Sequence, residues 1–240
     1  MWIIEEVKAR GKAAMKANYW NSVLAGFLVS LAVSGTGIWN AARSFQGSSD
    51  EMYTNAVTDE QAMQIMAAMA GAALVFTVVS SIISILVLNP LLVGCRHFFR
   101  RNLPSPAPTD EIGWGFKNRY GRNVLTMFLS SLFLVLWSLL FIIPGLVKCY
   151  SYRLVPYILE DYPDASPTEV ITMSREMMNG NKMRAFELDL SFIGWTLLTM
   201  VTLGIAGVFY VNPYYASTDA ALYEAIRAEK YGRADQGQLF

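Results

Sequence analysis

The sequence predicts an all-α, polytopic membrane helix bundle with six spans arranged as three hairpins. Hydrophobic residues make up 54% of the 240 residues and charged residues only 16%, whereas a soluble domain carries about 25% charged residues. Several long stretches contain no charge, which is typical of helices that cross a bilayer. The 19 basic and 19 acidic residues give a net charge of zero, so no overall field favours nucleic acid.

Six apolar segments supply these spans within a single membrane domain of residues 21–230. The first, Ser22 to Trp39, is 18 residues without a charge and would span about 27 Å as a helix. A cleaved signal peptide is the alternative, but the apolar run is longer than the apolar core of a typical signal peptide and no clear A-x-A site follows it. We expect the spans at about 22–39, 66–94, 123–143, 145–160, 187–204 and 205–224.

Two of these segments are irregular. The uncharged run from Ala62 to Cys95 has 34 residues, so it is either tilted or begins outside the hydrocarbon core. Pro90 near its end predicts a kink. The segment 145–160 contains Lys148 and Arg153, and it forms either a short return helix or an interfacial segment.

Two amphipathic helices are expected outside the spans. Residues 1–20 carry Lys8, Lys12 and Lys16 at every fourth position, which is typical of a solvated helix face or of an interfacial helix whose lysines meet anionic headgroups. Ser166, followed by proline and then by Glu169, predicts the start of a cytoplasmic helix at 167–178. Residues 231–240 form a tail.

The distribution of basic residues predicts the topology. With six spans and both termini in the cytoplasm, the cytoplasmic segments hold four bases before residue 20, six at 96–122, three at 175–184 and three after residue 224, 16 of 19 in total. This arrangement satisfies the positive-inside rule. If 145–160 did not cross, the three bases at 175–184 would move outside and weaken the bias. We therefore expect a multi-pass protein of the plasma membrane.

A faint internal repeat agrees with three hairpins. Each hairpin opens with a basic stretch containing asparagine or glycine, and each second helix carries a proline towards its inner end, at Pro90, Pro156 and Pro213. Chance similarity among apolar segments is the alternative explanation. The basic stretch from Arg96 to Arg122 is expected to be a loop, since its proline-rich part at 103–108 cannot form a helix.

A few polar residues inside the apolar segments are candidates for a functional site. A central arginine such as Arg153 must be paired or face water, and Asp189 and Asp219 are the nearest acidic candidates. These three either line a polar pathway or form an ion pair between helices, and Arg153 could also snorkel to headgroups. Asn89 and Asn212 precede prolines, so we expect them to bond the carbonyls that the prolines free. The expected membrane-surface contacts are Lys8, Lys12, Lys16, Arg96, Arg100 and Arg101.

The sequence contains no recognisable reaction centre. Its single histidine, His97, and its two cysteines, Cys95 and Cys149, leave no spacing suited to a metal site, a disulfide framework or a nucleophile–histidine pair. No P-loop, GxGxxG, HExxH or GxSxG motif is present. We expect neither an enzyme nor a bound cofactor or metal.

Several motifs resemble a bacterial integral-membrane family called domain of unknown function 975. They are KARGKAAMKANYW at 8–20, RHFFRRN at 96–102, IPG at 143–145, YSYR at 150–153, VPY at 155–157, SREMMNG at 174–180 and LDLSFIGW at 188–195. The turn at 143–145 and the amphipathic helix are also similar to membrane domains attached to some glycerophosphodiester phosphodiesterases. The resemblance implies a bacterial plasma-membrane protein and supplies no catalytic residues.

These observations lead to two expectations about function. The first is a non-enzymatic transport or export component or a partner subunit, in contact with the lipid bilayer and with a membrane-protein partner or a second copy. The alternative is a structural or lipid-sensing regulatory module that assembles with another membrane protein. An enzyme acting on lipid would need a convergent acid/base pair, which the sequence does not show.

Overall fold

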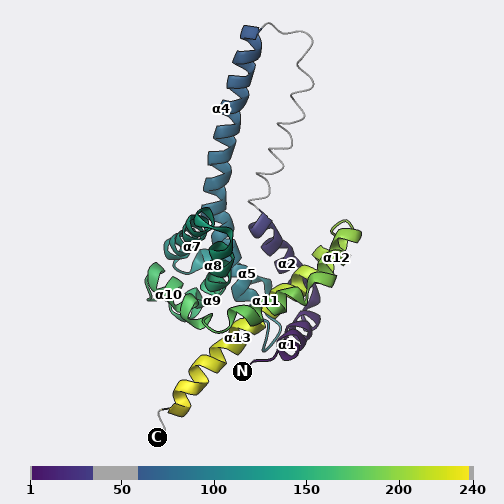
Figure 1. Ribbon diagram of the computed structural model, residues 1–240. Helices are drawn as coiled ribbons and strands as arrows, with labels where there is room; N and C mark the ends of the chain where they lie inside the picture. The colour runs from purple at the N-terminus through teal and green to yellow at the C-terminus, as the bar shows by residue number, and fades with distance from the viewer. Residues whose placement is uncertain (1, 35–58, 238–240) are drawn as a thin grey trace.

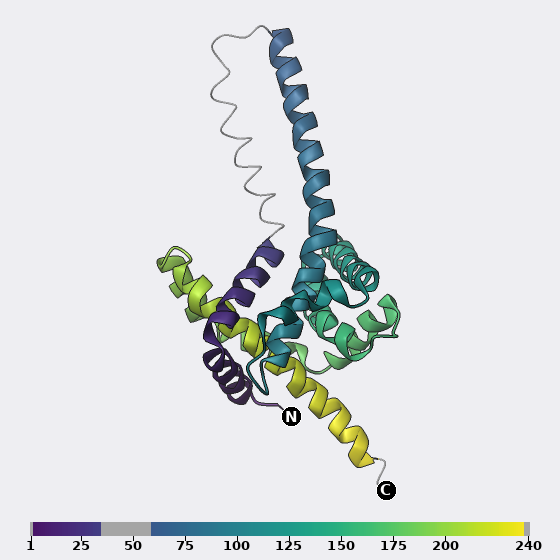
Figure 2. The same cartoon turned by 180° about the vertical axis from the view of Figure 1, so that it is seen from behind.

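The computed structural model describes residues 2–34 and 59–237, and within these residues every regular element is a helix (Figures 1 and 2). The expected all-α fold class is therefore confirmed. The elements are α1 (Ile4–Ala17), α2 (Tyr19–Ser34), α4 (Asp59–Ile83), η1 (Ser84–Leu88), α5 (Asn89–Arg101), η2 (Thr109–Gly113), α6 (Trp114–Lys117), α7 (Tyr120–Leu140), α8 (Ile142–Tyr152), α9 (Val155–Asp161), α10 (Pro167–Met177), α11 (Lys182–Leu190), α12 (Ile193–Val201), η3 (Gly207–Val211) and α13 (Asn212–Gly237).

The first hairpin is the longest. Its second arm is a continuous helix made of α4, the π-helical turn η1 and α5, and α4 stands far out from the rest of the molecule (Figure 1). The helix continues to Arg101, so the expected loop at 96–122 begins later than predicted. It ends where the prolines from Pro104 onwards remove backbone donors. The arm packs on α2 through α5.

The second hairpin pairs α7 with α8. Its return arm is broken, because α8 ends at Tyr152 and α9 begins at Val155. Pro156 is the physical reason, since its ring would clash with the carbonyl of Tyr152 in a continuous helix. The expected single helix over 145–160 is wrong in this respect, and Arg153 lies at the break.

The third hairpin pairs α11 and α12 with η3 and α13. Its first arm is interrupted between Leu190 and Ile193, and it begins at Lys182 instead of 187. Its turn contains Gly204 at φ +92°, a conformation that glycine adopts without steric cost. The second arm extends to Gly237, so α13 includes much of the expected tail.

Two short helices cover the ends of these arms. The buried side of α1, which includes Val7 and Met15, packs on α13. The helix α10 begins as predicted with a capping box, in which the Ser166 hydroxyl accepts from the Glu169 amide and the Glu169 carboxylate accepts from the Ser166 amide. The bond from the Ser166 backbone amide first, and then the Ser166 side chain, lower the pKa of the Glu169 carboxyl.

The most exposed large apolar side chains lie on the outer parts of the hairpins. Two helices, Met63–Arg101 and Tyr120–Leu140, are long and apolar enough to cross a membrane by length and composition, and Tyr19–Val33 is a shorter apolar helix. None of the most apolar window of Met63–Arg101 is buried. The predicted span at 22–39 is described only to Ser34, because 35–39 lie outside the described residues.

Candidate functional site

The structure brings together the three charged residues that the sequence singles out. Arg153 donates from Nε to an Asp219 carboxylate oxygen at 2.6 Å, and from its two terminal nitrogens to the Asp189 carboxylate at 2.9 and 3.0 Å. The Arg153 side chain is only 11% exposed and that of Asp219 only 2%. A buried arginine of this kind requires paired carboxylates, and here it has two.

A second arginine joins this site from the first hairpin. Arg96 on α5 donates to the other carboxylate oxygen of Asp219 at 2.6 Å. Asp219 on α13 therefore bridges two guanidinium groups that come from different hairpins. We call Arg96, Arg153, Asp189 and Asp219 the inner network; its two positive and two negative charges balance.

Three tyrosines add hydrogen bonds to the inner network. Tyr157 donates to Asp219 at 3.0 Å and lies 3.2 Å from an Arg96 nitrogen. Tyr150 and Tyr215 each donate to Asp189, at 2.8 and 2.9 Å. Each carboxylate thus accepts from both arginine and tyrosine, which leaves little capacity to act as a free acid or base.

A second layer of charges lies beside the first. Arg100 contacts Glu160 at 3.0 Å, Asp161 at 2.7 Å and Glu224 at 2.5 Å. His97 lies 2.7 Å from Glu111 and 3.0 Å from Glu160. These residues are the outer network, which consists of His97, Arg100, Glu111, Glu160, Asp161 and Glu224.

The two networks are joined by a pair of stacked tyrosines. The rings of Tyr157 and Tyr223 have centroids 5.0 Å apart, and the Tyr223 hydroxyl donates to Asp161. A phenol–phenol bond of 2.7 Å between Tyr162 and Tyr231 lies nearby, and burial first, then this bond, raises the pKa of Tyr231 to about 12. Both networks lie at the end of the molecule that carries α1 and the C-terminal end of α13, which we call the base (Figure 1).

Two proline junctions lie between the base and the hairpin ends. Pro90 and Pro213 each follow an asparagine that closes a five-residue π-helical turn, at η1 and η3. Neither proline can donate to the carbonyl four residues earlier. Tyr120 donates to that carbonyl in the first case, Leu86, at 2.7 Å, and Tyr19 donates to it in the second case, Phe209, at 2.9 Å.

These bonds correct the expectation for the two asparagines. The freed carbonyls are bonded by tyrosines from the neighbouring hairpin, because each tyrosine begins a helix that starts beside the π-turn. Asn212 instead donates to the Ser30 hydroxyl at 2.7 Å. The side chain of Asn89 has no hydrogen-bond partner among the described residues, and it lines a cavity between its own helix and α7.

Comparison with known proteins finds a match in the C-terminal part of the chain. Residues 117–230 are similar to a family described as "Protein of unknown function (DUF975)". The match supports the resemblance carried by the motifs between 143 and 195, and its range includes Arg153, Asp189 and Asp219. No curated protein and no solved structure matches the chain.

The expected surface contacts of this chain fall into two groups. Arg96 and Arg100 are wrong as headgroup contacts, since their side chains are 14% and 11% exposed and bind carboxylates inside the base. They lie inside because α5 continues to Arg101 as a helix packed on α9 and α13. The remaining residues are at the surface or partly so: Lys8, Lys12, Lys16 and Arg101.

Lys8 is engaged by the protein as well. Its ammonium donates to the Ser191 hydroxyl at 3.0 Å and lies 4.8 Å from the centre of the Phe192 ring. The apolar side of α1 contacts α13, so this helix is held by protein packing. Contact of Lys12 and Lys16 with headgroups stays a prediction.

The pairing of Arg96 with Asp219 was missed from the sequence. The signal that could have found it is the repeat, because Arg96 and Asp219 each lie six positions after the proline of their own arm, Pro90 and Pro213. Equivalent positions on two related arms meet at the base. Among the described residues, no cluster of three or more histidine, cysteine, aspartate or glutamate side chains is arranged to hold a metal ion.

Proposed function

We propose that this chain is a multi-pass protein of the bacterial plasma membrane that acts without catalysis, as a partner subunit of a membrane assembly. The observation that carries the proposal is α4, whose apolar surface is not buried by any other part of the chain that the structure describes. An apolar helix that stands alone must be covered by lipid or by another protein. The partner is a second membrane protein or a second copy of this chain.

The distribution of polarity supports a position in the membrane. Four apolar residues at the hairpin ends, Leu139, Ile143, Val201 and Leu203, are 75% to 94% exposed. In contrast, the side chains of Arg96, Arg153 and Asp219 in the inner network are only 2% to 14% exposed. Soluble proteins rarely expose apolar patches of this extent. Lipid is the solvent that makes the arrangement favourable.

The proposed topology has six membrane segments. They are α2, α4 with α5, α7, α8 with α9, α11 with α12, and η3 with α13. The base, with α1, α10 and the end of α13 beside it, lies on the cytoplasmic side, as the positive-inside rule favours. Both termini are then cytoplasmic. The ion pairs of the inner and outer networks join the three hairpins at the cytoplasmic side.

The length of the first hairpin favours a protein partner over lipid alone. The helix Met63–Arg101 has 39 residues, which corresponds to about 58 Å, whereas the hydrocarbon core is about 30 Å thick. Part of its apolar surface must therefore extend beyond the bilayer core or tilt steeply. Ala67 and Gly71 present a small-residue face at a spacing of four, which is typical of close helix–helix packing in membranes.

Replacing Gly71 with leucine tests the proposal. No other residue approaches within 4 Å of the position that a Gly71 side chain would occupy, so Gly71→Leu should leave the fold unchanged and block the partner. Ala73→Leu, on the opposite side of α4, is the matched control. Cross-linking in membranes and co-purification should lose a defined partner or dimer only for Gly71→Leu, and equal recovery in both variants would contradict the proposal.

A transport or export role is the second candidate, and the inner network is the observation that favours it. Arg153, Asp189 and Asp219, together with Arg96, place charges among all three hairpins, where a polar path could form. Arg153→Leu should abolish transport if the arginine lines a path. Unchanged function together with altered stability would favour a purely structural ion pair.

A further inference from the structure

The two proline junctions have the same arrangement of residues, but they differ in packing. We call the junction at Pro213 closed, because its helices are in contact, and the junction at Pro90 open, because a cavity separates its helices. Tyr19 and Tyr120 are each the first residue of a helix, α2 and α7, and each bonds the third residue of a π-turn. Counting from these tyrosines, Ser30 corresponds to Ser131. Counting from the π-turns, Asn212 corresponds to Asn89.

In the closed junction the corresponding asparagine and serine meet. Asn212 donates to the Ser30 hydroxyl at 2.7 Å, and that hydroxyl donates to the Gly26 carbonyl at 2.9 Å. A side-chain carbon on Gly26 would lie 2.8 Å from the Pro213 nitrogen, so only glycine permits this approach of α2 to α13. The Asn212 amide nitrogen and the Ser30 hydroxyl are therefore both bonded within the protein.

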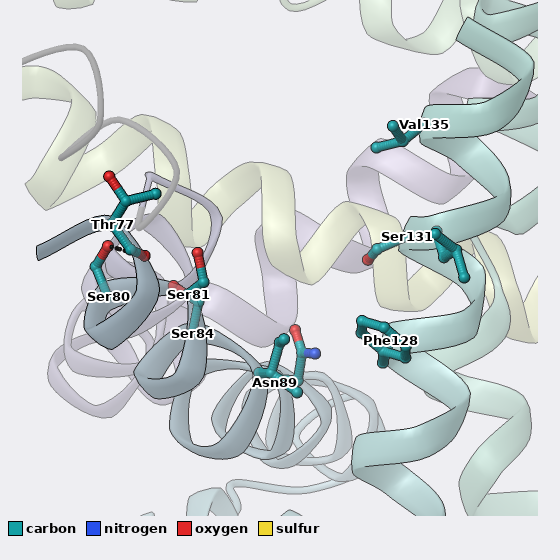
Figure 3. A pocket seen from close by; sticks show the side chains of 10 residues that line it. Thr77, Ser80, Ser81, Ser84, Asn89, Phe128, Ser131 and Val135 are labelled. Atoms are coloured by element: carbon teal, nitrogen blue, oxygen red, sulfur yellow. Dashed lines mark hydrogen bonds between the residues drawn. The ribbon is translucent and has the colours of Figure 1, made fainter. Parts of the chain in front are cut away.

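In the open junction the same groups are separated by a cavity. A cavity of about 570 Å³ lies between the α4–η1–α5 arm and α7 (Figure 3). Figure 3 shows Ser84 and Asn89 on one side and Ser131 on the other. Among the described residues, none of these three side chains has a hydrogen-bond partner.

The two junctions also differ in sequence at one corresponding position. Met127 stands where the closed junction has Gly26, seven residues after the tyrosine, and its side chain is buried. A methionine side chain fills space that a glycine leaves free, so the open junction lacks the glycine that permits the close approach of α2 to α13.

We propose that this cavity binds one acyl chain of a membrane lipid, with a hydrogen-bonding group of the lipid at Asn89 and Ser131. The walls are mostly apolar, with Phe128, Leu132 and Val135 on the α7 side. The volume lies within the range of about 300–1,000 Å³ that small-molecule sites occupy. The unpartnered amide and hydroxyls supply the polar complement that an ester or hydroxyl group would satisfy.

The membrane setting proposed above is the basis for choosing lipid as the occupant. Both walls of the cavity belong to the two helices that are long and apolar enough to cross a membrane. At that depth no water is available to satisfy Ser84, Asn89 and Ser131, so an occupant must do so. The ligand takes the place that the Asn212–Ser30 pair fills in the closed junction.

The test is native mass spectrometry of the full chain, released from nanodiscs of phosphatidylethanolamine and phosphatidylglycerol into a delipidating detergent. Wild type should retain one lipid per protein. Ser131→Phe, which fills the cavity, should reduce the retained fraction at least tenfold, whereas Leu139→Phe, exposed on the same helix outside the cavity, should not. Asn89→Leu keeps the volume but removes the polar group, and it should weaken retention by about tenfold.

Three outcomes would overturn the proposal. One is equal retention in Ser131→Phe and Leu139→Phe, and another is loss of lipid in both. The third is that Ser131→Phe releases a co-purifying protein instead of lipid, which would make the occupant a partner helix. Carbonate washing of membranes from each variant separates these outcomes from failure of membrane insertion, since a chain outside the membrane would be washed away.

Discussion

At the base of the bundle, Asp219 is 2% exposed and holds two arginines, whereas Val201 and Leu203 at a hairpin end are 81% and 94% exposed. A water-soluble protein distributes polarity in the reverse way. The comparison teaches that two different forces act on the same helices. Ion pairs and close packing hold the arms together at the base. The exposed apolar side chains at the hairpin ends are favourable only in apolar surroundings, which the proposed membrane would provide.

The largest effect should come from removing the shared carboxylate. Asp219→Asn leaves Arg96 and Arg153 without their common partner, and breaking a buried ion pair costs about 3–5 kcal/mol of unfolding free energy. Thermal and denaturant unfolding in detergent micelles, followed by circular dichroism, measures the loss.

The control for this prediction is an ion pair at the surface. Arg119 and Asp164 lie 2.6 Å apart, with side chains 53% and 85% exposed, and an exposed pair is worth about 0–1 kcal/mol. Asp164→Asn should therefore change stability little. Similar losses for both variants would mean that the base is not the buried anchor described here.

The next effect compares a glycine at the base, where two helices meet, with a glycine that has no neighbour. A side-chain carbon on Gly11 would lie 2.7 Å from the Thr218 backbone, so Gly11→Ala forces α1 away from α13 and should cost about 1–3 kcal/mol. Gly194, in α12, has no neighbouring atom within 4 Å. Gly194→Ala should be neutral or stabilising by up to about 1 kcal/mol, through helix propensity. A reversed order in the unfolding midpoints would contradict the comparison.

A smaller effect should appear at the two proline junctions. Tyr19→Phe and Tyr120→Phe each remove the hydroxyl that bonds a carbonyl freed by proline, and each should cost about 1 kcal/mol. The two losses should be similar, because the two bonds occupy equivalent positions. Tyr210→Phe, whose hydroxyl has no hydrogen-bond partner in the described part of the chain, is the control. A loss of stability at only one junction would contradict the claim that the two tyrosine bonds play equivalent roles.

The smallest effect should come from the capping box of α10. Ser166→Ala removes the hydroxyl that accepts from the Glu169 amide and should cost about 1 kcal/mol or less. The lowered pKa of Glu169 means that its carboxylate stabilises the folded helix above its ordinary pKa. This stabilisation should disappear as the pH falls through the lowered pKa. Acid titration of helix content should show that step in wild type and lack it in Glu169→Gln.

The sequence was sufficient for the features that depend on local pattern. Charge-free runs identified the apolar arms, and Ser166 with Glu169 identified the start of α10. The same reasoning also selected Arg153, Asp189 and Asp219, since a charge within an apolar run requires a partner. Whether these residues line a path or only join helices stays a prediction.

The sequence was insufficient where distant residues decide the outcome. Arg96 was placed at a surface because its neighbours in sequence are basic, yet Asp219 binds it from 123 positions away. The helix break at Arg153 depends on Pro156, and the bonds of Tyr19 and Tyr120 depend on which helix start lies beside which π-turn. Only the three-dimensional packing of the arms supplies this information.

Cysteine labelling in the membrane tests the central claim most directly. Leu197, on α12 between the base and the hairpin end, is 58% exposed in the structure, and in the proposed membrane that exposed surface faces lipid. In a Cys149→Ser background, where Cys95 is buried, Leu197→Cys and Ser166→Cys are each treated with a membrane-impermeant maleimide. We predict that Ser166→Cys reacts in inside-out vesicles alone and that Leu197→Cys reacts only after detergent is added. Rapid labelling of Leu197→Cys in intact membranes would contradict the account.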